Sequence, residues 1–262
     1  MKAFLLCACW LVVAQASVLS PARSFLAVAP QHPARCDVVL QQKKKKKPPK
    51  AAKKAASTAV VDAEEDLATQ QACTTLLGEI AKEQRSMDTI TTSLATLEAS
   101  PVPGKLKRAV VGDWKLVFAS DQSAVAPFVT GASDGPFAVL EDIYHRVETL
   151  NVQSIEITRK IGPFGNMCNS LHGKWSVADG DGDVMSWKTQ YMLDERGREV
   201  KPPGGGASHR ARASHISSEL LVLRPEAAAQ SYAVFTKLGK GKLKKELDDY
   251  SIDTEMFIGP AA

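Results

Sequence analysis

Beyond Gly104 the chain alternates apolar and polar residues with a period of two, and this pattern restricts its fold more than any other feature. Because successive side chains of a strand point to opposite faces, such runs predict half-buried strands. The pattern occurs in Trp114–Ser120, Ile155–Thr158, Leu171–Val177 and Met185–Tyr191, and two later apolar runs, Leu220–Leu223 and Tyr232–Phe235, add further strands. Short successive strands separated by turns predict an antiparallel meander that closes into a β-barrel over residues 104–262.

Residues 57–103 have the period of an α-helix instead. Two apolar faces follow each other, separated by a break near Ser86: Cys73, Leu76, Leu77 and Ile80, then Met87, Ile90, Leu94 and Leu97. The prolines of Ser100–Gly104 end this helical segment. Its polar faces carry charges of both signs, whereas helices that lie on membranes are rich in lysine and arginine. We therefore expect the helices to pack against the barrel that follows.

The N-terminus resembles a two-part targeting sequence. In residues 1–16, Lys2 precedes an apolar run, and Ala14-Gln15-Ala16 is typical of a signal-peptide cleavage site. The apolar run is shorter than the roughly 20 residues of a membrane span. Residues 17–56 predict a disordered leader, transit-like at first and Lys-rich from Lys43 to Lys54.

A signal peptide followed by a transit-like stretch resembles the leaders that direct proteins into complex plastids. Phe25 resembles the phenylalanine that is typical near the start of the transit part of such leaders. The predicted location is therefore a plastid reached through the secretory route. Plain secretion is the alternative.

Charge and cysteine content exclude several classes of function. The whole chain has a net charge of +4. Residues 1–61 carry eleven basic side chains and one acidic side chain, which leaves 22 basic and 28 acidic side chains in the remainder. The predicted domain is therefore acidic, which argues against a nucleic-acid partner. Only Cys73 and Cys168 lie beyond the leader, and we expect two buried or half-buried thiols rather than one disulfide.

No motif predicts catalysis. The chain has no G-x-S-x-G, and Gly204–Gly206 is not followed by the Lys-Ser/Thr pair of a phosphate-binding loop. Asp179–Asp183 lacks the later residues of a calcium-binding loop, so a solvated hairpin turn is expected. The histidines have no metal-ligand spacing. We predict a protein that is not an enzyme and that has neither a cofactor nor a metal.

The predicted barrel could be filled by its own side chains or could hold a small apolar ligand, because an eight-stranded barrel is just wide enough for either. Aromatic and branched residues on the inward faces would line such a ligand. The candidates are Trp114, Leu116, Phe118, Trp175, Trp187 and Tyr191. Residues 197–216 predict a loop insert, in which His209 and His215 would be mobile.

The region Leu94–Asp121 resembles the plastid lipid-associated protein family, also called fibrillins or plastoglobulins. In that family a helix ending in Leu-Glu and a proline-containing turn precede a Gly-x-Trp strand, and here Leu97–Pro103 and Gly112–Trp114 match these parts. The pair Gly112 and Trp114 also resembles the opening strand of lipocalins. Downstream, Tyr191–Arg196 is similar to the family's Tyr-Leu-Asp-x-x-Arg stretch, which marks Asp194 and Arg196.

This resemblance covers about residues 70–197. It implies a lipocalin-like barrel that binds lipids, quinones or carotenoids, with peripheral contact to plastid membranes at thylakoids or plastoglobules and without catalysis. The alternative is a structural or assembly partner of a plastid membrane complex, in which the barrel is filled. The oligomeric state is left open.

Overall fold

The computed structural model describes residues 56–100, 106–134, 137–160, 165–178 and 182–258, with the side chains of the first helix described from Leu67 onward. The predicted signal peptide and almost all of the predicted disordered leader lie outside the described residues. So do residues 179–181, which begin the predicted hairpin turn.

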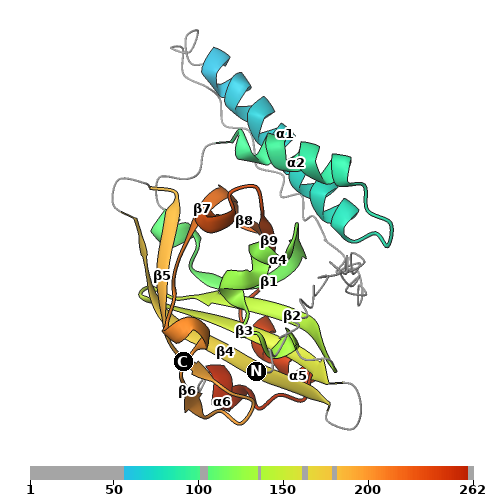
Figure 1. Cartoon of the computed structure of the whole chain (residues 1–262). Helices are drawn as coiled ribbons and strands as arrows, with labels where there is room; N and C mark the ends of the chain where they lie inside the picture. Colours follow the sequence, from blue (N-terminus) through green and yellow to red (C-terminus); the bar gives the residue numbers. More distant parts are fainter. Residues whose placement is uncertain (1–55, 101–105, 135–136, 161–164, 179–181, 259–262) are drawn as a thin grey trace, which may run out of the picture. The chain divides into compact units, whose positions relative to one another are not determined.

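Eight antiparallel strands form a closed barrel (Figure 1). Neighbouring strands are hydrogen-bonded in the order β4-β3-β2-β1-β9-β8-β7-β5, and the pairing of β5 with β4 closes the ring. The barrel strands are β1 (Gly112–Ala119), β2 (Ala138–Val147), β3 (Asn151–Lys160), β4 (Asn166–Val177), β5 (Val184–Leu193), β7 (Ser208–Ile216), β8 (Leu220–Pro225) and β9 (Ala233–Lys237). The predicted antiparallel barrel with preceding helices is thus confirmed.

Part of the predicted loop insert 197–216 is a strand. A two-residue strand, β6 (Glu199–Val200), pairs with the end of β5, and a short 3₁₀ turn, η3 (Pro203–Gly205), leads into β7. Strand β7 is hydrogen-bonded to β5 on one side and to β8 on the other, and Ala211 and Ala213 are fully buried. Two neighbouring strands therefore supply the pairing that the alanine- and arginine-rich sequence does not favour by itself.

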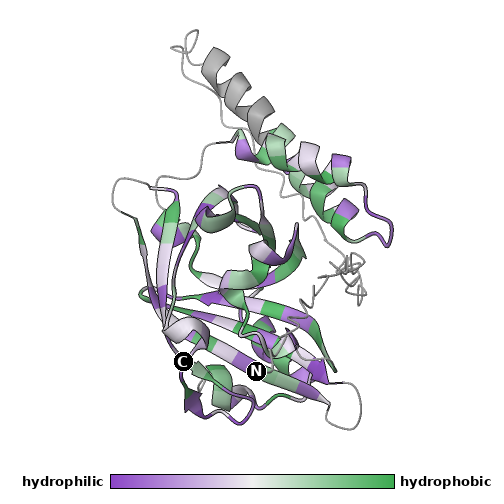
Figure 2. Ribbon diagram, in the orientation of Figure 1, coloured by the Kyte–Doolittle hydropathy of each residue, from purple (hydrophilic) through white to green (hydrophobic). Residues whose placement is uncertain are grey.

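Helices α1 (Ala56–Ile80) and α2 (Met87–Glu98) pack on the outer face of the barrel, as predicted. Their hydrophilic connection, coloured purple in Figure 2, brings the Glu79 carboxylate to the backbone N–H of Ser86 at 2.6 Å. The helices share an apolar cluster with β1, β8 and β9, whose buried members are Ala72, Leu76, Ile80, Ile90, Leu94, Leu97, Phe118, Leu220, Val222, Tyr232 and Val234. Arg224 of β8 adds an ion pair with Glu98 at 2.5 Å.

Helices α5 (Lys242–Asp249) and α6 (Thr254–Ile258) cover the outer face of β2, β3 and β4, and sequence analysis did not predict them. In α5, only Leu243 and Leu247 are buried, one helical turn apart. They join an apolar cluster with Tyr144, Ile155, Ile157, Cys168 and Phe257. So short and charged a helix has little stability of its own and depends on this contact with the sheet.

A polar cluster fixes α5 to the barrel. The Lys115 ammonium lies 2.8 Å from carboxylate oxygens of both Asp142 and Glu246, and the Tyr250 hydroxyl donates to Asp142 at 2.7 Å. Burial alone would lower the pKa of Lys115, but the two carboxylates outweigh it and the pKa is raised. The cluster thus holds a charged lysine against the outer surface of β1.

The closure of the barrel by β4 and β5 predicts that position 173 requires glycine. A Cβ atom at this position of β4 would lie 2.3 Å from the backbone oxygen of Lys188 in β5. We expect Gly173→Ala to lower the free energy of unfolding by about 1–3 kcal/mol in urea denaturation, because the two strands must move apart. Gly78→Ala is the control, since no atom lies within 4 Å of a Cβ there and alanine favours the helix. Equal stability of Gly173→Ala and the wild type would contradict the close β4–β5 contact.

Candidate functional site

The barrel interior is the first candidate site, and four of the six predicted ligand-lining residues face it. Trp114, Leu116, Trp175 and Trp187 belong to the apolar cluster inside the ring of strands. The Trp114 indole N–H donates to the backbone oxygen of Val110 at 2.7 Å, beside helix α3 (Leu106–Ala109). The Trp175 indole likewise donates to the Glu148 backbone oxygen at 2.7 Å. Their indole N–H groups are thus satisfied by the barrel itself, and contact with a ligand stays a prediction.

The predicted inward orientation of Phe118 and Tyr191 is wrong. A β-bulge shifts the register of β1 against β9 between Leu116 and Phe118, so that Phe118 points outward and lies 5.9 Å from the Tyr232 ring beneath α1 and α2. A second bulge, between β4 and β5, pairs Tyr191 with His172. These two rings stack on the outer face, with 4.6 Å between their centroids.

The contacts of Gln153 show that His172 and Tyr191 lie on the outer face, because Gln153 binds both His172 and helix α6. Its amide lies 3.4 Å from His172 Nε2 and donates to the Phe257 backbone oxygen in α6 at 2.7 Å. Bulges such as these reverse the alternation of a strand, and the sequence pattern does not reveal them.

The connection between β1 and β2 enters the barrel and fills its middle. We call residues 121–134 the plug; they form α4 (Gln122–Val125), η1 (Ala126–Phe128) and η2 (Ala132–Asp134). Phe128 is fully buried, and its ring lies 5.0 Å from His145, 5.7 Å from Trp187 and 5.2 Å from Phe235, measured between ring centroids. Because these three rings come from β2, β5 and β9, Phe128 lies between opposite walls of the barrel.

A carboxylate holds each end of the plug. Asp121 accepts the backbone N–H groups of Ser123 and Ala124 at 2.7 and 3.1 Å, and it also accepts the Ser231 hydroxyl at 2.6 Å. These hydrogen bonds, together with the Ser120 hydroxyl, outweigh burial, so the pKa of Asp121 is lowered. At the other end, fully buried Glu156 of β3 accepts the Thr130 N–H at 2.6 Å and the Thr130 hydroxyl at 2.5 Å. The plug is therefore latched on both sides.

Beside the plug, the inner faces of β2, β3 and β4 also carry polar side chains. His145 Nδ1 lies 3.0 Å from the Ser154 hydroxyl, and Glu156 pairs in register with Asn169. Within the described part of the chain, His145 Nε2 and Asn169 Nδ2 are buried without a hydrogen-bond partner. Burial lowers the pKa of His145 to about 3, so its imidazole is neutral at physiological pH. Buried polar atoms without partners are costly and point to water or a ligand at this place.

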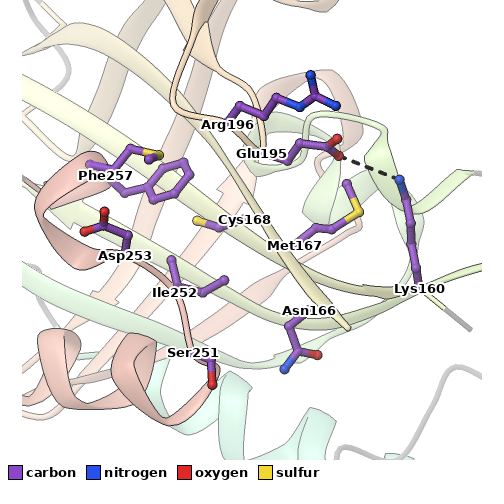
Figure 3. A pocket seen from close by; sticks show the side chains of 11 residues that line it. Lys160, Asn166, Met167, Cys168, Glu195, Arg196, Ser251, Ile252, Asp253 and Phe257 are labelled. Atoms are coloured by element: carbon purple, nitrogen blue, oxygen red, sulfur yellow. Dashed lines mark ion pairs between the residues drawn. The ribbon is translucent and has the colours of Figure 1, made fainter. Parts of the chain in front are cut away.

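A surface hollow of about 350 Å³ is the second candidate site (Figure 3). It lies between the ends of β3 and β4, the β5–β6 turn and α6, and Figure 3 shows the side chains of Cys168, Ile252 and Phe257 directed into it. Lys160 and Glu195 form an ion pair at its rim, 3.6 Å apart. Burial and the nearby Glu156 carboxylate raise the pKa of the Cys168 thiol well above its ordinary value, which disfavours the nucleophilic thiolate form.

The residues marked by the family resemblance lie at this hollow and at the start of β1. Arg196 lines the hollow, whereas Asp194 folds the β5–β6 turn by accepting the backbone N–H groups of Arg196 and Arg198, both at 2.9 Å. The Arg198 guanidinium, which donates to Asp194, and these two backbone bonds lower the pKa of Asp194 to about 2. Gly112 has a φ of +144°, a conformation open to few other residues, and its backbone approaches the end of the Lys237 side chain. Both Asp194 and Gly112 thus have structural roles.

The two histidines of the predicted mobile loop belong to β7 instead. His209 packs against Trp187 with the two rings tilted by 33° and 5.5 Å between their centroids. His215 lies on the opposite face, where its Nδ1 is 3.2 Å from the Leu97 backbone oxygen of α2 and its Nε2 is 3.9 Å from the Cys73 thiol. Cys73 and Cys168 are both free thiols, as predicted.

Two further observations concern the described residues as a whole. Their His, Cys, Asp and Glu side chains nowhere gather in a group of three or more that could hold a metal ion. None of their helices combines the length and the apolar composition of a membrane span.

The latch on the plug can be tested at Thr130. Thr130→Val keeps the shape of the side chain but removes the hydroxyl that donates to Glu156, and a hydrogen bond to a carboxylate contributes about 1.5–3 kcal/mol. We expect a loss of stability of this size in urea, together with faster hydrogen exchange of plug amides. The matched control is Thr96→Val on α2, where an exposed hydroxyl donates only to its own helix. A Thr130→Val variant as stable as the control would contradict the latch.

Comparison with known proteins assigns no family to this chain. No family model matches the chain, and no curated protein matches its sequence. The resemblance to plastid lipid-associated proteins therefore depends on the motifs around Gly112–Trp114 and Tyr191–Arg196, and it stays a prediction.

Proposed function

We propose that this protein binds a lipid, quinone or carotenoid inside its barrel, without catalysis, and acts in a plastid at the surface of thylakoids or plastoglobules. An eight-stranded barrel has the width for a small apolar ligand. The Gly112–Trp114 strand and the two-part leader support the plastid family.

The observation that carries the proposal is the division of the barrel interior into an apolar and a polar part. Trp114, Trp175 and Trp187 provide the large apolar surfaces. His145 and Asn169 each place a buried polar nitrogen on the inner face with no partner among the described residues. Pockets for apolar molecules combine such surfaces with a few polar groups that orient the ligand.

The plug supports a ligand that enters by displacement. Phe128 is held by stacking and edge contacts, while the side-chain hydrogen bonds that attach the plug to the barrel join Asp121 to Ser231 and Thr130 to Glu156. The middle of the plug can thus move while both ends stay attached. Segments that close over ligands commonly move in this way.

One observation favours the second candidate function, that of an assembly partner of a plastid membrane complex. Phe128 already fills the middle of the barrel, so its interior could be a permanent core. In that case α1 and α2, or the segment 201–212, would dock onto the complex. This alternative predicts that the protein co-purifies with a defined complex. It also predicts that no ligand ever displaces Phe128 from the barrel interior.

Extraction of the protein from its host tests the proposal. We expect the chain, purified from a photosynthetic host through a C-terminal tag, to release a lipid, quinone or pigment into organic solvent in near-stoichiometric amount by mass spectrometry. Trp187→Leu should lower this amount at least severalfold, because Trp187 faces the interior, and Phe118→Leu should not, because Phe118 faces outward. Consistent absence of bound lipid, with no binding to liposomes, would refute ligand binding.

Location is tested separately. A fluorescent protein fused to the C-terminus should accumulate in plastids, because the leader then remains at the N-terminus. Deletion of residues 17–56 with the signal peptide retained should send the fusion to the secretory pathway. Secretion of the unaltered fusion would contradict the plastid part of the proposal and favour the alternative location.

A further inference from the structure

The side chain of Phe128 occupies a box of aromatic rings inside the barrel. Its ring is nearly parallel to Trp187, at an interplanar angle of 22°, and meets Phe235 edge-on at 73°. His145 meets it edge-on at 75°. All four residues are buried, and Trp187, Phe235 and His145 belong to strands of the ring, whereas Phe128 belongs to the plug. The strands therefore surround one flat ring with three rings of their own, and the ring in the middle belongs to the β1–β2 connection.

One wall of this box has an unused hydrogen-bond donor. If the Ser154 hydroxyl donates to His145 Nδ1, only Nε2–H is left without a partner; the opposite tautomer would leave both the Ser154 proton and the Nε2 lone pair unused. The first arrangement satisfies more groups and is therefore favoured. The imidazole packs among Phe128, Trp187 and Phe235 and forms one wall of the aromatic box, and its Nε2 is buried.

We propose that the aromatic box is the head-group site of the barrel, in which a planar ring bearing a carbonyl replaces Phe128, stacks on Trp187 and accepts a hydrogen bond from His145 Nε2. This inference rests on the proposed function and narrows it to one class of ligand. The plug occupies the site when no ligand is bound.

The surroundings of the box select against other head groups. A pure hydrocarbon ring would leave the His145 donor without a partner, at the same cost as Phe128 does now. A phosphate or carboxylate head would be placed near the buried Glu156, which has no ion-pair partner among the described residues, and the neutral imidazole offers no compensating charge. A neutral carbonyl satisfies the donor and adds no charge.

Two tetramethylated rings of similar shape test the inference. Tetramethyl-1,4-benzoquinone has two carbonyls and no ring position open to thiols, and 1,2,4,5-tetramethylbenzene has neither carbonyl. Binding of each to the purified full chain is measured by equilibrium dialysis. We expect the wild type to bind the quinone, and Phe128→Ala to bind it about tenfold more tightly or better, because the competing ring is absent. Phe118→Ala, which removes an outward-facing ring, should leave the affinities for the quinone and for tetramethylbenzene unchanged.

His145 provides the decisive comparison. In the Phe128→Ala background, His145→Leu should weaken quinone binding about five- to tenfold, the share of one hydrogen bond, and should leave tetramethylbenzene binding unchanged. Where Phe128→Ala fails to give a cooperative unfolding transition, Phe128→Val takes its place. Equal affinities for the two rings, a preference for the quinone that survives the loss of His145, or a wild type that binds no quinone would each overturn the inference.

The outcomes separate this inference from the proposed function. Protein from the host that carries a lipid without a ring carbonyl would overturn the inference and support ligand binding. Protein from the host without any ligand would refute the proposed function, whatever the affinity of the variants for the two rings.

Discussion

The pairing of β4 with β5 is the constraint on which the rest of the structure depends. It closes the ring of eight strands and so separates an inside from an outside. The strands approach so closely at this seam that Gly173 cannot be given a side chain without a clash with the Lys188 backbone. With the ring closed, each barrel strand has a hydrogen-bonded neighbour on both sides, and each strand has two faces that must both be covered.

Both faces are covered, but by different means. Inside, tryptophans and the plug fill the space, with Phe128 at its centre. Outside, α1 and α2 cover one part of the wall and α5 and α6 another. As a result, β3 is buried on both faces: Ile155 and Ile157 lie under α5 and α6, and Ser154 and Glu156 face the interior. The polar side of this strand is thus the inner one.

The inward orientation of the polar side of β3 provides polar groups in the barrel interior. Had Ile155 and Ile157 pointed inward, Ser154 and Glu156 would have pointed outward, away from His145 and Thr130. Instead Glu156 latches Thr130, and His145 and Asn169 present polar nitrogens that the described residues leave unpaired. A polar group buried in a low-dielectric interior is costly without a partner, so its presence favours a role in binding over a purely structural one. The same interior accommodates both proposed functions, depending on whether Phe128 is ever displaced.

The sequence by itself determined that the chain forms amphipathic helices followed by an antiparallel barrel, because periods of 3.6 and 2 are local properties of the chain. It also identified Trp114, Trp175 and Trp187 as interior residues. It could not identify Phe128 or Glu156, since nothing near them in the chain shows that the β1–β2 connection returns into the barrel. The outward turn of Phe118 and Tyr191 depends on bulges that arise only when strands pair. Which face of β3 points inward was decided by α5 and α6, about 90 residues further along the chain, because an alternating strand has two distinct faces but only its tertiary partners choose between them.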